Sequence, residues 1–172
     1  ITVGLVDDHE LIADGLRARL ERDGGIIVAW VAHSKAEAER ALTRGSRVDV
    51  VLVDIALPDG SGLDLLPTQA SPGPRFVVLC ANDGPAYVST AYRRGASGFV
   101  VKGERTETII TAIRTVAAGG RAFTAASLES IHTLRSLTRR ELQVVRLVAS
   151  GRSNDEIGAE LGIGIKTVEF HL

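Results

Sequence analysis

The sequence predicts a two-part protein, in which an α/β domain with a doubly wound parallel sheet is followed by a small all-helical module. Five short apolar runs, rich in β-branched residues, alternate with segments of helical period over residues 1–119. The runs do not alternate polar with apolar residues, which is typical of strands covered on both faces. After Gly119 and Gly120 this pattern ends and only helices are predicted. The α/β domain is therefore expected to close near these two glycines.

The strands and helices of this domain are predicted from the lengths and periods of the segments. The predicted strands are Thr2–Val6, Ile26–Val31, Val48–Val53, Phe76–Cys80 and Gly98–Val101. The predicted helices are the segment that carries Leu11, Leu16 and Leu20, then Lys35–Leu42, Leu63–Gln69, Pro85–Arg94 and Thr106–Ala118. The last segment has an apolar stripe, as in an amphipathic helix; it is formed by Ile109, Ile110, Ile113 and Val116. Five strands that alternate with five helices predict right-handed crossovers and a doubly wound sheet.

The composition excludes several classes of protein. The chain has 172 residues, 45% of them hydrophobic, and a formal net charge of −1. This apolar content is sufficient for a packed core, and the balanced charge gives no sign of a polybasic nucleic-acid tail. A single Cys excludes an internal disulfide and a Cys-based zinc cage, and no apolar run has the length of a membrane span or the pattern of a signal peptide. We therefore expect a cytoplasmic protein. Because the chain lacks Met and begins at Ile1, we also expect trimmed termini.

Acidic residues stand where the first and third predicted strands end. Asp7 and Asp8 follow the first strand, Asp54 follows the third, and Lys102 follows the fifth. In a flavodoxin-like strand order, 2-1-3-4-5, the first and third strands are neighbours, and ligands bind outside the carboxyl ends of the strands. Close carboxylates repel one another unless a cation lies among them, and Mg²⁺ prefers oxygen ligands of this kind. A carboxylate beside Mg²⁺ and a Lys can attack a phosphoryl group and form an acyl phosphate.

Residues 1–119 resemble a response-regulator receiver domain. The residues that carry this resemblance are Leu5-Val6-Asp7-Asp8-His9, Asp54 followed by Pro58 and Gly62, and the segment from Gly95 to Lys102. The resemblance implies that Asp54 is the phosphoacceptor. It also implies an Mg²⁺ site in which Asp8 and Asp54 bind the ion directly, Asp7 binds it through water, and the backbone carbonyl of Ala56 supplies a further oxygen.

The same resemblance assigns three residues to sensing the phosphoryl group. Lys102 would neutralise its charge, and Phe99 would be the aromatic switch. Cys80 stands at the end of the fourth strand, where the family has a Thr or Ser whose hydroxyl binds a phosphoryl oxygen. A thiol is only a weak hydrogen-bond donor. Cys80 therefore either weakens the switch, or makes it sensitive to oxidation, or acts only as a small apolar residue of the core.

Residues 137–172 resemble the helix-turn-helix module of the NarL/FixJ, or LuxR-type, regulators. Capping residues predict one helix over Glu141–Ala149, after Thr138, and a second that follows Ser153 and ends at Leu161. The family has its recognition helix, which lies in the major groove, at the position of Lys166–Leu172. The DNA contacts implied by the resemblance are those of Lys166, Thr167, Glu169 and Phe170.

Two residues depart from the LuxR-type pattern. Gly164 stands where a Ser or Thr cap is usual, and Glu169 would repel phosphates, although it can accept a hydrogen bond from cytosine. The chain stops inside the recognition helix, so we expect a truncated module that lacks the fourth helix of the family. The expected domains are a receiver at 1–119, a linker at 120–136 that is compatible with a short helix, and the truncated helix-turn-helix at 137–172.

Together the two resemblances predict a two-component response regulator and DNA-binding transcription factor rather than an enzyme. A sensor histidine kinase would phosphorylate Asp54 in the presence of Mg²⁺, and phosphorylation would control formation of a homodimer and binding to promoter DNA. No membrane partner is expected. A second hypothesis is an atypical, phosphorylation-independent regulator or protein-interaction module, because Cys80 and Glu169 both depart from the pattern. A phosphatase of the haloacid dehalogenase type would need an Asp at position 56, where the chain has Ala56.

Overall fold

The computed structural model describes residues 1–44, 47–67, 73–81, 84–124, 143, 147, 152–164 and 167. The chain divides into two compact units, Ile1–Leu134 and Arg135–Leu172. The predicted capping residue Thr138 lies outside the described residues, as does most of the predicted helix Glu141–Ala149.

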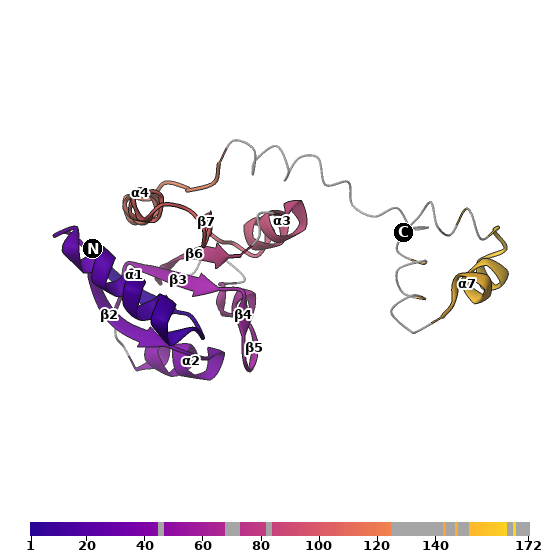
Figure 1. The fold of residues 1–172 in the computed structure, drawn as a ribbon, viewed down its shortest axis with the longest axis horizontal. Helices are drawn as coiled ribbons and strands as arrows, with labels where there is room; N and C mark the ends of the chain where they lie inside the picture. The colour runs from indigo at the N-terminus through magenta and orange to yellow at the C-terminus, as the bar shows by residue number, and fades with distance from the viewer. Residues whose placement is uncertain are drawn as a thin grey trace. The chain divides into compact units, whose positions relative to one another are not determined.

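The first unit is built on a five-stranded parallel sheet with the order β2-β1-β3-β6-β7 (Figure 1). This is the predicted flavodoxin-like order, so the expected fold class is confirmed. The strands are β1 (Thr2–Val6), β2 (Ile27–Ala32), β3 (Val50–Asp54), β6 (Arg75–Cys80) and β7 (Gly98–Val101). Each of these strands begins and ends within two residues of the predicted position. Apolar strands buried on both faces end where polar residues begin, which is why the sequence located them well.

Helices cover both faces of this sheet and enclose two cores. On one face lie α1 (Glu10–Arg22) and α4 (Thr106–Ala117), whose apolar side chains share a core with Leu5, Leu52 and Leu79. On the other face lie α2 (Lys35–Thr43) and α3 (Pro85–Arg93), which share a second core with alternate residues of the same strands. The unit therefore has three layers, and the carboxyl ends of its strands form one edge between them.

The predicted helix over Leu63–Gln69 is wrong for those of its residues that the structure describes. The structure has a short 3₁₀ helix there, η1 (Gly62–Leu65), and residues 68 and 69 lie outside the described part. Pro67 explains the early end, because a residue before proline is driven out of the helical region, and Leu66 is extended with ψ 141°. Gly62 lies so close to the carbonyl oxygen of Asp54 that a Cβ would collide with it. Two short strands that the sequence did not predict, β4 (Ala56–Leu57) and β5 (Gly60–Ser61), form a hairpin just before η1.

The chain turns back after α4 and runs along the free edge of β7. We call residues 121–124 the strap. Ala122 forms a parallel bridge to Gly98, accepts a hydrogen bond from the backbone N–H of Phe99 at 2.9 Å and donates one to Ser97 at 2.9 Å. Gly98 permits this approach, because a Cβ there would lie 3.0 Å from the Cβ of Ala122. The strap therefore covers an edge strand that would otherwise leave its backbone groups unpaired.

The strap is also held by an aromatic side chain of α3. The ring of Phe123 meets that of Tyr92 edge to face, with centroids 5.5 Å apart, and the guanidinium of Arg121 lies 4.8 Å from the centroid of Tyr92. Edge-to-face rings and a cation over a ring are both favourable contacts. The first residues of the predicted linker are thus packed against α3 and β7.

The second unit contains α7 (Asn154–Leu161), which agrees with the helix predicted after Ser153. The Ser153 hydroxyl accepts a hydrogen bond from the Glu156 backbone N–H, and the Glu156 carboxylate accepts one from the backbone N–H of Ser153 at 2.8 Å, which completes a capping box. Gly162 ends the helix with φ 64°, a conformation that glycine adopts readily. Ile157 is fully buried against Leu147 and nearby side chains. None of the described helices has the length and apolar character that a bilayer crossing needs.

Candidate functional site

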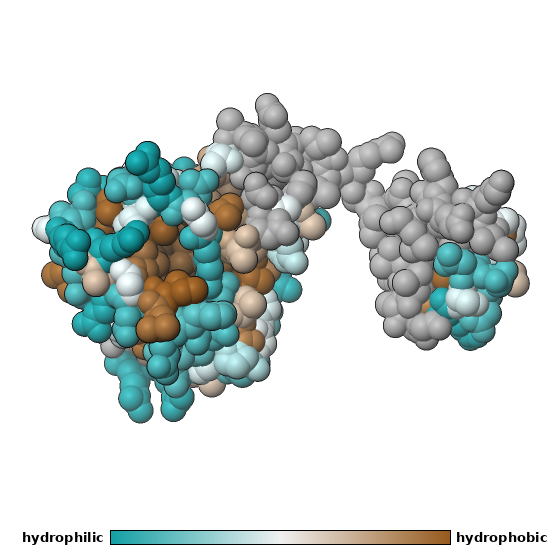
Figure 2. Space-filling view, in the orientation of Figure 1, coloured by the Kyte–Doolittle hydropathy of each residue, from teal (hydrophilic) through white to brown (hydrophobic). Residues whose placement is uncertain are grey.

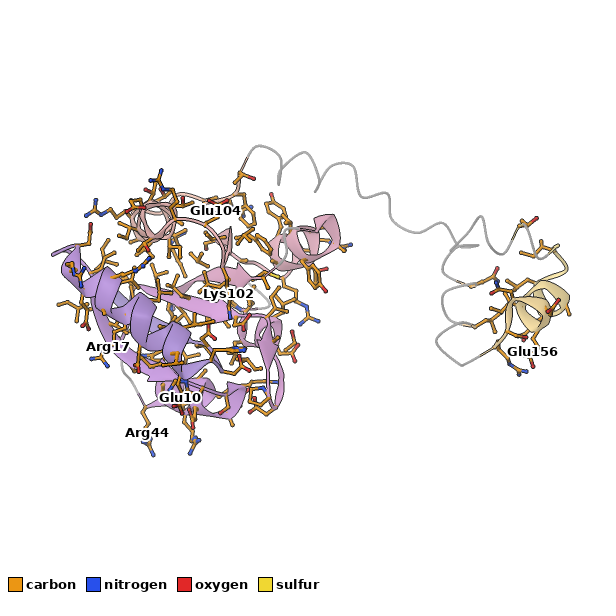
Figure 3. All side chains as sticks on the ribbon, viewed as in Figure 1. Glu10, Arg17, Arg44, Lys102, Glu104 and Glu156 are labelled. Atoms are coloured by element: carbon orange, nitrogen blue, oxygen red, sulfur yellow. The ribbon has the colours of Figure 1, made fainter. Side chains whose placement is uncertain are left out.

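The predicted site residues of the first unit lie at the carboxyl edge of its sheet. Asp7 directly follows β1, Asp54 is the last residue of β3, and Lys102 directly follows β7. Because β1 and β3 are hydrogen-bonded neighbours, with Val6 opposite Val53, their two carboxylates emerge side by side. Figure 3 shows Lys102 at the ends of the strands, inside the first unit. The structure thus brings together the residues that the sequence predicted to meet.

Lys102 joins the two buried carboxylates. Its Nζ lies 2.7 Å from Oδ2 of Asp54 and 2.8 Å from Oδ2 of Asp7. Asp7 is fully buried and Asp54 is 5% exposed. Burial by itself would lower the pKa of Lys102, but the hydrogen bonds to Asp54 and Asp7 and the charges of these two carboxylates outweigh it, so the pKa is raised above its usual value. Lys102 is therefore a fixed cation that faces the carboxylate of Asp54.

Asp8 and His9 complete the cluster at the start of α1. Asp8 is partly exposed, and its Oδ1 lies 2.6 Å from Nδ1 of His9. The backbone N–H of His9 donates to Oδ1 of Asp7 at 3.0 Å, which fixes the turn between β1 and α1. Asp7, Asp8, His9 and Asp54 each offer a ligand atom, and these atoms all lie within 4.8 Å of one another. From the sequence, His9 was predicted only as part of the Leu5–His9 motif, and the signal for its place in this cluster is an imidazole directly after the acidic pair.

The carboxylates at this edge fit a hard divalent cation. Three carboxylates converge here, and the single positive charge of Lys102 is shared by two of them, Asp7 and Asp54. The cluster therefore retains an excess of negative charge. Among the described residues, Oδ2 of Asp7 accepts no hydrogen bond, and the charge that faces it is the Lys102 ammonium at 2.8 Å, which it shares with Asp54. A buried carboxylate oxygen without a hydrogen bond is costly unless a cation compensates it. The donor set of carboxylate oxygens suits Mg²⁺, which keeps several of its waters.

The predicted switch residues are both buried in the core on the α3 face. Cys80 ends β6 and is 6% exposed, and Phe99 lies in β7 and is 3% exposed. Both belong to the core that includes Val88 and Ala91 of α3. The backbone carbonyl of Cys80 accepts a hydrogen bond from the N–H of Lys102 at 2.7 Å. The backbone of Cys80 is therefore hydrogen-bonded to Lys102, which contacts Asp54, and the backbone of Phe99 is hydrogen-bonded to the strap.

The loop after Asp54 is fixed by acidic side chains. Asp59 accepts hydrogen bonds from the backbone N–H groups of Lys35 at 2.7 Å and Ala36 at 2.9 Å, at the first turn of α2. These two hydrogen bonds, of which that from Ala36 has the larger effect, hold the pKa of Asp59 below its usual value. Asp64 pairs with Arg94 at 2.6 Å and with Lys35 at 3.3 Å. Ala56, whose carbonyl the sequence analysis assigned to the metal, begins β4 in this fixed loop.

A cavity of about 240 Å³ opens next to the site between α1 and the start of α4. Asp7 and Lys102 line it together with apolar residues of α1, among them Leu11 and Ile12. Leu11 is 89% exposed and Ile12 is 46% exposed. Figure 2 shows hydrophobic side chains gathered in a hollow on this face of the first unit, surrounded by hydrophilic ones. A partner that approached Asp54 from this side would meet an apolar surface.

The predicted DNA contacts are only partly within the described residues. Thr167 is exposed and helical, and its backbone N–H donates to the carbonyl of Gly164 at 2.8 Å. Lys166, Glu169 and Phe170 lie outside the described part of the chain. The described residues of the second unit therefore show the capped helix α7 and the turn after it.

Comparison with known families identifies both units. Residues 3–114 match the response regulator receiver domain, and residues 135–172 match the bacterial regulatory proteins of the luxR family. A receiver domain followed by a LuxR-type helix-turn-helix defines a response regulator. The chain belongs to the NarL/FixJ family of response regulators.

Relatives and solved structures agree with this assignment. The chain is 37% identical to the transcriptional regulatory protein MctR of Rhizobium johnstonii, over 99% of this chain and 83% of MctR. It is 39% identical to the transcriptional regulatory protein UhpA of Salmonella typhimurium, over 99% of this chain and 87% of UhpA.

Two solved structures have the same fold. RcsB, solved as two dimers bound to two parallel DNAs, has a TM-score of 0.87 at 22% identity, over 99% of this chain and 87% of that one. The response regulator ChrA of a heme-sensing two-component system has a TM-score of 0.63 at 28% identity, over 99% of this chain and 86% of that one. At 22% identity the first likeness concerns the fold alone.

Proposed function

We propose that this response regulator is switched by phosphorylation of Asp54 and that the switch controls dimerisation and binding to promoter DNA. The phosphoryl donor would be a sensor histidine kinase, and the place of action would be the cytoplasm, where promoter DNA is found. We further propose a receiver at 1–119, a linker at 120–136 and a helix-turn-helix module at 137–172. The observation that carries the proposal is the meeting of Asp7, Asp54 and Lys102 at one edge of the sheet.

Asp54 has the properties of a phosphoacceptor. Its carboxylate lies at the end of a central strand with Lys102 at 2.7 Å, so the attacking oxygen is positioned beside a cation before the reaction. Attack by an Asp carboxylate on a phosphoryl group gives an acyl phosphate. Lys102 would then stabilise the charge on the phosphoryl oxygens.

We propose that the acidic cluster holds Mg²⁺, with Asp8 and Asp54 as direct ligands, Asp7 acting through water and the Ala56 carbonyl as a backbone ligand. The fit of the cluster to a hard cation supports this assignment. When bound, the ion would neutralise charge on the phosphoryl group in transfer. Asp7 and Lys102 would keep the carboxylate of Asp54 oriented, because both are held by backbone hydrogen bonds of the adjoining strands.

The switch would act through the face formed by α3, β7 and α4. Cys80 and Phe99 share a core with α3, so a change at Asp54 that moves either side chain would be felt by that helix. We propose that Cys80 weakens this response, because its thiol is a poor donor to a phosphoryl oxygen. An atypical regulator that works without phosphorylation is the alternative, and Cys80 is the observation that favours it.

The partners follow from the exposed surfaces and from the relatives. Leu11 and Ile12 border the cavity that reaches Asp7 and Lys102, which gives a kinase an apolar contact surface beside the phosphoacceptor. RcsB, which shares the fold, was solved as dimers on DNA. By analogy we propose a homodimer on promoter DNA, with contacts from Lys166, Thr167, Glu169 and Phe170.

The experiment is phosphorylation by acetyl phosphate with and without Mg²⁺, mapped by mass spectrometry. We expect one added phosphoryl group on Asp54, dependent on Mg²⁺ and absent in Asp54→Asn. Asp64→Asn is the matched control, because Asp64 is an exposed carboxylate in η1, ten residues after Asp54, that pairs with Arg94 and Lys35. Label that persists in Asp54→Asn would overturn the assignment. Label on Asp54 without any change in dimerisation would favour the phosphorylation-independent alternative.

A further inference from the structure

A second cavity, of about 710 Å³, lies between α4 and the strap. Its floor is apolar and contains Phe99, Val100 and Ala112, which are 3%, 6% and 5% exposed. Ala122 and Phe123 of the strap line one side of it. The cavity shares no lining residue with the acidic cluster or with the cavity beside that cluster. Concave sites of about 300–1,000 Å³ with apolar floors are typical of binding sites for small organic molecules.

One face of α4 forms the opposite wall of this cavity. Thr108, Thr111, Ala112 and Thr115 line it, and their spacing of three or four residues places them on the same face of the helix. The Thr111 hydroxyl donates to the backbone carbonyl of Glu107 at 2.8 Å. The hydroxyls of Thr108 and Thr115 form no hydrogen bond within the described part of the chain. The wall therefore offers hydroxyl groups above an apolar floor.

Two arginines line the cavity from opposite ends of α4. Arg105 directly precedes the helix, and Arg121 begins the strap, four residues after the helix ends. A helix of 12 residues is about 18 Å long, so the two side chains come from the two ends of the cavity. Among the described residues neither guanidinium forms an ion pair, although that of Arg121 lies 4.8 Å from the centroid of the Tyr92 ring.

The charge of the lining indicates the class of molecule that fits. Glu107 is the one carboxylate that lines the cavity, against the two guanidiniums, so the lining has an excess of positive charge. Guanidinium groups bind carboxylates, sulfonates and phosphates through paired N–H donors. A neutral apolar molecule would leave both arginines without a counterion, and a cation would be repelled. An apolar molecule that carries an acidic group matches both the floor and the arginines.

We propose that this cavity binds an amphipathic organic anion, with its apolar part on Phe99 and Val100 and its acidic group on the guanidiniums of Arg105 and Arg121. The site is separate from the proposed phosphorylation site and does not depend on it. A molecule bound there would contact both α4 and the strap, and would therefore hold the strap against the edge of β7.

The experiment measures the binding of two fluorescent probes to the whole 172-residue chain. The probe 8-anilinonaphthalene-1-sulfonate is an amphipathic anion, and N-phenyl-1-naphthylamine has the same apolar body without the charge. We expect the anion to bind about fivefold or more tightly than the neutral probe. The double variant Arg105→Gln/Arg121→Gln should lose this preference. Arg22→Gln/Arg44→Gln is the matched control and should keep it, because both residues are exposed and lie outside the cavity.

Two further measurements locate the bound probe. In ¹H–¹⁵N spectra, the anion should shift the backbone amides of Ala112 and Ala122 and leave those of α2 unchanged. Thr111→Phe places a ring in the cavity from an exposed helix position, and it should remove the binding of both probes. Leu11→Ser is the control for the smaller cavity beside Asp7 and should have no effect.

Each other outcome overturns the proposal. Equal affinities of the wild type for the two probes, or a preference for the anion that persists in Arg105→Gln/Arg121→Gln, would show that the arginines do not select an anion. Binding that is lost in Leu11→Ser but not in Thr111→Phe would place the probe in the smaller cavity. Probe affinity that falls as the protein concentration rises would show that a second copy of the chain covers this face.

Discussion

Lys102 is the residue on which the electrostatics of the site depends. It contacts two carboxylates that the fold buries, so its removal would leave both without their cation. Removing one partner of a buried ion pair lowers stability by much more than the intact pair contributes to it, because the remaining charge is left buried without a counterion. The arrangement that we propose prepares Asp54 for phosphorylation therefore also makes the site without a bound cation sensitive to substitution.

We predict that Lys102→Met, with EDTA present, lowers the free energy of unfolding at pH 8 by roughly 3–5 kcal/mol. The pKa of Lys102 is raised on folding, so its contribution is complete below its unfolded pKa of about 10.4 and is lost as the pH rises through the folded pKa. Urea unfolding between pH 8 and 11 should show the two proteins converging only at the alkaline end.

Lys35→Met is the control for this prediction. Lys35 pairs with Asp64, whose side chain is 41% exposed, and such pairs contribute about 1 kcal/mol or less. A pH-independent difference for Lys102→Met would show that the loss comes from packing and not from charge.

Cys80 allows a prediction about the strength of the switch. Cys80→Thr introduces a hydroxyl of similar size, and a hydrogen bond to a charged acceptor contributes about 1.5–3 kcal/mol, of which a thiol supplies much less. We predict that the effect of fluoroberyllate with Mg²⁺ on the monomer–dimer constant grows about five- to thirtyfold in Cys80→Thr. Sedimentation or size exclusion of both proteins, with and without the analogue, measures this. If the two proteins respond equally, residue 80 belongs to the core and not to the switch.

At the scale of elements, the strap shows how a linker can become part of the domain before it. Its backbone pairs with β7 through Ala122, and its side chains pack on Tyr92 of α3. Phe99 is in direct contact with it, since its N–H donates to Ala122. The strap therefore joins the strand that carries the predicted switch residue, the helix beside it and the segment that leads to the second unit.

We predict that Phe123→Ala lowers the free energy of unfolding of the first unit by roughly 1–3 kcal/mol, less than for a fully buried Phe, because Phe123 is only half-buried. A double-mutant cycle with Tyr92→Leu should give a coupling of about 0.5–1.5 kcal/mol, as expected for an edge-to-face pair. Tyr87→Ala, an exposed ring on the same helix, is the control and should change stability little. Additive effects of the Phe123 and Tyr92 substitutions would mean that the rings do not stabilise the strap.

At the scale of the whole molecule, the chain consists of two units with separate cores. The first has two cores on either side of a sheet, and the second is organised around Ile157. Trp30 is the one tryptophan of the chain, and its indole lies directly over Gly4, where a Cβ would collide with the ring. The fluorescence of Trp30 therefore reports on the first unit.

We predict that fluoroberyllate with Mg²⁺ stabilises the first unit and leaves the protection of α7 unchanged, because the proposed binding site of the analogue is Asp54. At an analogue concentration 100 times its dissociation constant, the unfolding followed by Trp30 should be stabilised by about 2.7 kcal/mol. Hydrogen exchange of the α7 amides, measured in parallel, should not slow. The Asp54→Asn protein provides the baseline. Equal protection of α7 would mean that the two units unfold as one cooperative body.

The sequence alone determined the sheet and the residues at its edge. Strands buried on both faces are continuous apolar runs, so β1 and β7 were located without error. A parallel sheet brings all carboxyl ends to one edge, so the meeting of Asp7, Asp54 and Lys102 followed from chain order. The capping box of α7 was also local information, because its donor and acceptor lie three residues apart.

Only the tertiary structure decided features that depend on contacts between distant residues. The helix expected after β3 became a 3₁₀ turn, because Pro67 and the close approach of Gly62 to Asp54 override helical propensity. The strap forms because Ala122 pairs with Gly98, which is distant in the sequence. The side chain of His9 turns toward Asp8, and helix propensities do not determine this orientation. Periodicity records which face of an element is buried but not which partner it meets, so pairings of this kind appear only when the chain is folded.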